Sequence, residues 1–139
     1  MCRVTKDVDA TVESLWGMVS DVARWDSLLP TVDKVSRLDA GGPIGVGSRF
    51  EVDQPGLAKA VYEITDWRPN RGFTWVAAAP GVRTTATHEL TAEGQGARLA
   101  LGVDWSGPLA WLVRLMFASK ARRMVELEAE TFAGLAHRR

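Results

Sequence analysis

His88 is the residue of this sequence whose type best suits acid–base chemistry. It lies between Ala86 and Leu90 in a stretch where apolar and polar side chains alternate. A neutral imidazole has an unperturbed pKa near 6.5, so it can accept a proton or bond to a ligand carbonyl. The alternative is a core histidine that bonds to a neighbouring backbone group or to Tyr62. His88 is therefore a candidate catalytic residue and a candidate ligand contact.

Aromatic side chains of neighbouring segments suit a pocket for an apolar ligand that carries a few oxygen atoms. Phe50, Tyr62 and Trp75 each occupy the dry side of an alternating stretch. A ring with a polar tip combines a large apolar surface with one hydrogen bond. Ordinary core packing explains the same pattern, so ligand contact is a hypothesis for at least one of the three.

Lys120 lies within an apolar stripe that is predicted near the C-terminus. At 100° per residue this stripe also contains Leu109, Val113, Met116, Phe117, Met124, Leu127 and Leu135. Val113, Met116 and Phe117 are candidate ligand contacts together with Lys120. An ammonium that faces a cavity binds a carboxylate or an enolate, or acts as an activated amine when its pKa is lowered. The alternative is that the aliphatic stem covers apolar surface while the charged end reaches water.

The elements that position these residues begin with a short strand at 3–9 and a helix. Apolar residues recur there at three- and four-residue intervals, and Asp9 or Thr11 is available as the helix cap. A second short helix or turn is expected before Pro30. These two elements carry Val12, Leu15, Trp16, Val19, Val22, Trp25, Leu28 and Leu29.

A meander of about six strands follows between residues 33 and 106, where glycine or proline recurs every ten residues or so. After Gly107 and Pro108 neither residue type returns until Gly134, which predicts one long helix. The dry face of a one-sided sheet must be covered, and this helix supplies the cover. The predicted fold is α+β: a curved antiparallel sheet of about seven strands wrapped around a C-terminal helix, in a single domain at 1–139.

A sheet that curls around one helix cannot fill its concave side with that helix alone, so a cavity is expected. Trp25, Leu28 and Leu29 are predicted to close one end of it, which makes Trp25 a further candidate ligand contact. Two loops are predicted over the mouth of the cavity, "GGPIGVG" at 41–47 and "QPGLAKA" at 54–60.

Four stretches resemble the helix-grip superfamily of START domains, birch-pollen allergens and polyketide cyclase/dehydrase-like proteins. They are "DATVESLWGMVSDVARWDSLLPTVDKVSRL", "GVGSRFEV", "YEITDWRPNRGFTWV" and "THELTAEGQGARLALGVDW". The resemblance implies a pocket for a polyketide, lipid, isoprenoid or aromatic metabolite, used by a carrier or sensor. One alternative is a cyclase or dehydratase that uses His88 for proton transfer, and another is a protein-interaction module. The resemblance carries over no catalytic motif.

The composition argues against several other classes of protein. The 139 residues suit one domain, and the 17 basic residues equal the 17 acidic ones, which disfavours nucleic-acid binding. Cys2, His88 and His137 are too few for a disulfide framework or a zinc site, and we expect neither a metal nor a cofactor. No signal peptide or membrane-spanning stretch is recognisable, so a cytoplasmic location without integral membrane association is expected.

Trp111 and Leu115 project from the side of the predicted C-terminal helix opposite to its apolar stripe. Cover by the strand loops, contact with a second copy in a homodimer, or contact with a membrane would each explain this pair. The first two are favoured because acidic residues balance the basic ones nearby: Lys120, Arg122, Arg123, Glu126, Glu128 and Glu130.

Overall fold

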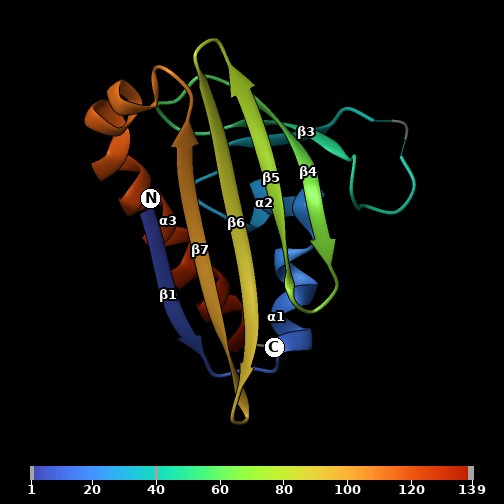
Figure 1. Cartoon of the computed structure of the whole chain (residues 1–139). Coiled ribbons are helices and arrows are strands. Elements are labelled where there is room, and N and C mark those ends of the chain that lie inside the picture. The colour runs from blue at the N-terminus through green and yellow to red at the C-terminus, as the bar shows by residue number, and fades with distance from the viewer. Residues whose placement is uncertain (1, 40, 138–139) are drawn as a thin grey trace.

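Seven antiparallel strands form one sheet, and the helices lie on one face of it (Figure 1). The computed structural model describes residues 2–39 and 41–137. The strand order is β1-β7-β6-β5-β4-β3-β2, so the first strand pairs with the last one. The strands are β1 (Cys2–Val8), β2 (Lys34–Arg37), β3 (Arg49–Asp53), β4 (Ala60–Arg68), β5 (Gly72–Ala79), β6 (Val82–Glu93) and β7 (Gly96–Ser106). The predicted α+β class and strand number are confirmed.

Short helices follow β1 as the spacing predicts. They are α1 (Val12–Val19), the 3-10 helix η1 (Val22–Arg24) and α2 (Trp25–Leu28). Thr11, rather than Asp9, caps α1, because its Oγ1 accepts a hydrogen bond of 3.1 Å from the backbone N–H of Ser14. Trp25 and Leu29 are each only 2% exposed, so this segment does bury its apolar side chains against the sheet.

The alternation along β4 is interrupted by one extra residue. The register against β5 shifts between Ile64 and Asp66, which is the signature of a β-bulge. Trp67 consequently pairs with Phe73 and shares its inner face, where its ring centroid lies 5.0 Å from that of Trp16. An uninterrupted strand would have turned Asp66 inward instead.

The long helix α3 (Ala110–His137) lies along the concave side and packs against β1, β7 and α1 (Figure 1). Small residues let it approach closely, and its buried positions are Ala110, Val125, Ala129, Phe132 and Ala136. Leu109, Met116 and Leu127 are 44%, 64% and 42% exposed, so the predicted apolar stripe was wrong at these three positions. No helix in the described part of the chain is long and apolar enough to cross a bilayer.

Trp111 and Leu115 are among the most exposed apolar side chains of the described residues, at 62% and 77%. The alternative in which strand loops cover them is therefore wrong. The homodimer contact stays a prediction.

Candidate functional site

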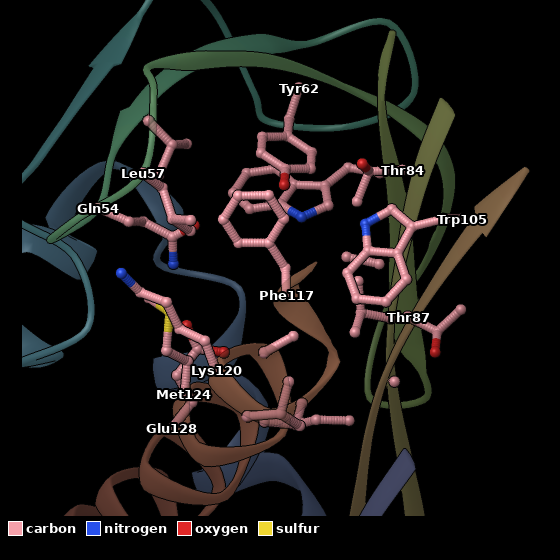
Figure 2. A pocket seen from close by; sticks show the side chains of 18 of the residues that line it. Gln54, Leu57, Tyr62, Thr84, Thr87, Trp105, Phe117, Lys120, Met124 and Glu128 are labelled. Atoms are coloured by element: carbon pink, nitrogen blue, oxygen red, sulfur yellow. The ribbon is translucent and has the colours of Figure 1, made fainter. Parts of the chain in front are cut away.

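A cavity of about 440 Å³ lies between the sheet and α3. Ligand pockets commonly measure roughly 300–1,000 Å³, so this one can hold a molecule of metabolite size. Apolar side chains dominate its walls, and a few polar groups interrupt them (Figure 2). The wall includes Trp25, Val52, Tyr62, Trp75, Thr84, Ala86, His88, Leu101, Val103, Trp105, Val113, Phe117, Lys120, Met124 and Glu128.

The cavity persists because side-chain size changes along the inner face of the sheet. The first half of β6 presents the small side chains of Thr84 and Ala86 to it. Larger residues fill the other end of the concave side, where Phe73 and Phe132 are completely buried. Close packing therefore extends over only part of the interior.

His88 is held between a stacking contact and a hydrogen bond to the same residue. Its ring centroid lies 4.1 Å from that of Phe73, with the two planes inclined by 13°. Nδ1 lies 3.2 Å from the Phe73 carbonyl oxygen, which can only accept, so Nδ1 carries the proton. Burial lowers the pKa of His88 to about 4, against a smaller opposing effect of this bond. The imidazole is neutral at pH 7 and presents Nε2 as an acceptor.

Trp25 forms part of the cavity wall and joins several rings. Its centroid lies 5.2 Å from that of Trp75 and 5.4 Å from that of His88. Its buried indole Nε1 has no hydrogen-bond partner among the described residues. An unpartnered buried N–H is uncommon in folded proteins.

Tyr62 stacks on Trp75, with centroids 4.7 Å apart and planes inclined by 27°. Figure 2 shows its hydroxyl directed toward the interior of the cavity. Burial, and then the charge of Glu128, raise the pKa of Tyr62 to about 12. The phenol is therefore protonated at neutral pH and can donate a hydrogen bond to a ligand.

Glu128 supplies a carboxyl group to the cavity wall from α3. Its Oε1 accepts a hydrogen bond of 2.8 Å from the hydroxyl of Thr31, which is 3% exposed. Burial raises the pKa of Glu128 to about 7, and the Thr31 bond opposes this shift. The group thus exchanges its proton near neutral pH, which His88 does not.

Most of the residues predicted from the sequence as ligand contacts meet at this cavity. Seven of them line it: Trp25, Tyr62, Trp75, His88, Val113, Phe117 and Lys120. Phe50 is completely buried behind it, with its ring 6.1 Å from that of Trp75. Met116 points to solvent because it lies about 100° around the helix from Phe117. Phe50 thus lies on the inner side predicted for it but does not line the cavity, whereas Met116 does not lie on the apolar side predicted for it.

The sequence interpretation missed Glu128, which it assigned to the charges that balance a basic surface. Eleven residues at about 100° each bring Glu128 to within about 20° of Phe117 on the helix. This helical projection could have identified Glu128 as a residue of the cavity-facing side. It was obscured because Met116 and Leu127, both apolar, drew the predicted stripe away from the true inner face.

The segment between β3 and β4 borders the mouth of the cavity, as predicted for 54–60. Gln54, Leu57 and Ala58 contribute to the lining. Figure 2 shows Lys120 reaching from α3 toward the segment that carries Gln54 and Leu57. Its Nζ lies directly against Gly56, whose φ of +73° favours glycine.

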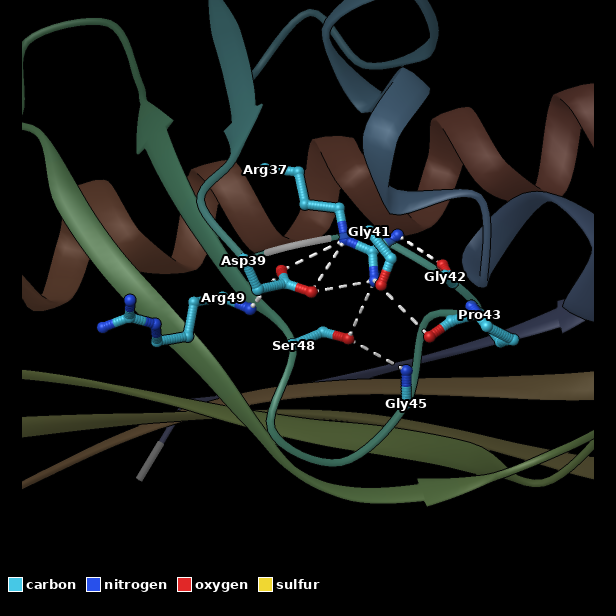
Figure 3. A network of polar contacts seen from close by, with 8 residues as sticks. All are labelled: Arg37, Asp39, Gly41, Gly42, Pro43, Gly45, Ser48 and Arg49. Atoms are coloured by element: carbon cyan, nitrogen blue, oxygen red, sulfur yellow. Dashed lines mark hydrogen bonds and ion pairs between the residues drawn. The ribbon is translucent and has the colours of Figure 1, made fainter.

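The glycine-rich loop at 41–47 lies elsewhere, so its predicted place over the mouth is wrong. Arg37 ties it to the end of β2 (Figure 3). The guanidinium donates to the Asp39 carboxylate at 2.9 Å and to the Gly42 carbonyl at 2.7 Å. The Arg37 bond is the main reason why the pKa of Asp39 falls to about 2. Further Arg37 contacts reach the Gly41 and Pro43 carbonyls and Ser48 Oγ.

Solved structures share this fold across nearly the whole chain. The Zhui aromatase/cyclase from Streptomyces sp. R1128 has a TM-score of 0.74 at 19% identity, covering 99% of this chain and 93% of its own. Norcoclaurine synthase from Thalictrum flavum has a TM-score of 0.73 at 14% identity, covering 96% and 83%. Protein jhp0584 from Helicobacter pylori has a TM-score of 0.78 at 10% identity, covering 96% and 84%. At these identities the likeness establishes the fold.

The sequence itself gives the family. No curated protein matches it significantly. The family model described as "Polyketide cyclase / dehydrase and lipid transport" matches residues 1–136. Because this match spans almost the entire sequence and the fold agrees with it, the chain belongs to the polyketide cyclase/dehydrase and lipid transport family.

Proposed function

We propose that this protein binds a mostly apolar small molecule in the cavity between the sheet and α3, as a carrier or sensor. The observation that carries the proposal is the cavity of about 440 Å³, which remains although several tryptophans pack around it. An empty volume of this size lowers the stability of a core, so its presence favours a role in ligand binding. The family description, which includes polyketide chemistry and lipid transport, supports a polyketide, lipid, isoprenoid or aromatic metabolite as the ligand.

Polar groups at the wall suit a ligand with a few heteroatoms. The Tyr62 hydroxyl and the Glu128 carboxyl belong to residues that line the cavity, and both can form hydrogen bonds. Sites of this kind use a small number of polar contacts to orient an otherwise apolar molecule. A cytoplasmic location and the absence of nucleic-acid binding stay predictions.

Catalysis by His88 is the weaker alternative. The ring is neutral at pH 7, and a group whose pKa lies near 4 is a weak base at that pH. Among the solved structures, one is titled an aromatase/cyclase and another is a synthase in complex with dopamine and hydroxybenzaldehyde. Positioning within a cavity can accelerate a cyclisation with few dedicated groups, so cyclase activity remains the second hypothesis.

Native mass spectrometry of the protein purified from its own host tests the proposal. We expect a copurifying small molecule in the wild type and its loss in Ala86→Phe, which fills the cavity from β6. Thr85→Phe is the matched control, because the next residue along a strand points to the other face. Equal retention of the molecule by both variants would show that it binds elsewhere.

A further inference from the structure

Two charged side chains border the cavity, and they occupy different places along it. Lys120 lies at the mouth, where its Nζ lies against Gly56, and it also lines a shallower outer groove with Arg123. Glu128 lies two turns further along α3, belongs to the cavity and does not line that groove. A ligand that extends into the cavity therefore meets the carboxyl group of Glu128 there, whereas the ammonium group of Lys120 stands at the mouth.

The carboxyl group of Glu128 has unused capacity for hydrogen bonding. Thr31 occupies one position on Oε1, and the described residues provide no other hydrogen bond or ion pair to this group. A carboxylate offers about four acceptor sites. The carboxylate is partly removed from water, which costs desolvation free energy. A cation that binds at the unused acceptor positions offsets part of this cost.

The cavity that Glu128 lines also has aromatic rings in its wall. The ring of Trp75 stacks on that of Tyr62, and its centroid lies 5.2 Å from the ring centroid of Trp25. Phe117 lies on the same side of α3 as Glu128. The face of an aromatic ring carries negative potential and attracts ammonium groups, most strongly in tryptophan. The charge of Glu128 reaches the Tyr62 hydroxyl, whose pKa it helps to raise, so the two groups act on the same region of the cavity.

We propose that the ligand of this cavity carries a protonated amine, which pairs with Glu128 while its apolar body lies against Trp75 and Phe117. This inference rests on the proposed function and narrows its ligand class. A carboxylate ligand would meet a like charge at the same point. A neutral ligand would leave the carboxylate without a counter-charge, so both are expected to bind more weakly than the amine.

Isothermal titration calorimetry at pH 8 with three matched ligands tests the assignment: 1-naphthylmethylamine, 1-naphthalenemethanol and 1-naphthoic acid. We expect the amine to bind about tenfold more tightly than the alcohol, as one charge-assisted hydrogen bond allows. The acid should bind most weakly. The advantage of the amine over the alcohol should grow between pH 6 and pH 8, as Glu128 loses its proton while the amine keeps its own.

Glu128→Gln keeps an acceptor for Thr31 and removes the charge, so it should abolish the preference for the amine and leave the affinity for the alcohol. Glu126→Gln is the matched control, since Glu126 is exposed and pairs with Arg122 on the outer face. Equal affinities for all three ligands in the wild type, or a preference for the amine that survives in Glu128→Gln, would overturn the inference. Failure of all three to bind would contradict the proposed function itself.

Discussion

The hydroxyl group of Thr31 donates a hydrogen bond of 2.8 Å to Oε1 of Glu128, although the two residues lie far apart in the sequence. The bond connects the segment after α2 with the middle of α3, next to the cavity. It stabilises the charged form of Glu128 and so opposes the effect of burial on its pKa. One hydroxyl thus contributes both to the attachment of the helix and to the charge of the cavity.

Thr31→Val should raise the pKa of Glu128 above its present value of about 7, because burial then acts without opposition. The variant should also lose about 1–2 kcal/mol of unfolding free energy through the missing bond. Carbon-13 NMR titration of the Glu128 carboxyl and urea unfolding measure the two effects. Thr31→Ser retains the hydroxyl and should leave the pKa in place. A pKa that stays the same in Thr31→Val would exclude the bond as its determinant.

Glu128 and His88 should have opposite effects on stability as the pH changes. The pKa of Glu128 is raised from 4.5 to about 7, so its contribution is present in acid and is lost as the pH rises through 7. The pKa of His88 is lowered from 6.5 to about 4, so its contribution is present above 6.5 and is lost as the pH falls through 4. Each contribution is of the order of 3 kcal/mol. The two should largely cancel between pH 4.5 and 6.5.

Single variants should reveal each contribution. In Glu128→Gln the unfolding free energy should fall on acidification from pH 6.5, because only His88 then titrates. In His88→Asn it should rise on acidification from pH 7, because only Glu128 then titrates. Urea unfolding at half-unit pH steps gives these slopes. Parallel profiles for the two variants would contradict the assigned directions.

Arg37→Met should loosen the glycine-rich loop at 41–47 without affecting the cavity. The guanidinium holds several backbone carbonyls of this loop together with Asp39, and methionine offers none of these bonds. We expect at least tenfold faster amide exchange in the loop and unchanged binding of 1-naphthalenemethanol. Hydrogen-exchange mass spectrometry and calorimetry provide the readouts. A large loss of affinity would mean that the loop does take part in binding.

Trp111→Ser combined with Leu115→Ser should convert the predicted homodimer to a monomer. The two side chains lie one turn apart on α3 and are exposed, so burying them in a contact would stabilise an assembly. Sedimentation velocity over a range of protein concentrations detects the change. Val61→Ser, an exposed apolar residue on β4, is the control. A wild-type protein that sediments as a monomer at all concentrations would reject this contact.

Alternating side chains allowed most of the sheet to be predicted, because burial on one face imposes a period of two. Ala86, His88 and Leu90 identified β6 in this way. The β-bulge before Asp66 was not predicted. One added residue shifts the alternation of inward and outward side chains, but no characteristic residue type marks it in the sequence. The placement of Trp67 on the inner face depended on that shift.

The candidate site was predictable where residues are apolar and less so where they are charged. Tyr62 and Trp75 followed from the pattern of their strands. Glu128 did not, because an acidic residue near basic ones is usually a surface charge, and its burial depends on the position of Thr31 in three dimensions. The glycines at 41–47 indicated a loop but contained no information on which side of the sheet it lies.

The pairing of β1 with β7 has a consequence for how the chain acquires its structure. Cys2 is opposite Val103 and Val8 is opposite Ala97, so the first strand has no partner until β7 is available, roughly ninety residues later in the sequence. Contacts between residues so distant in sequence slow folding, because a long loop must close before they form. Until β7 forms, the backbone N–H and C=O groups of β1 have no strand partner, so this segment is open to pairing with other chains during folding.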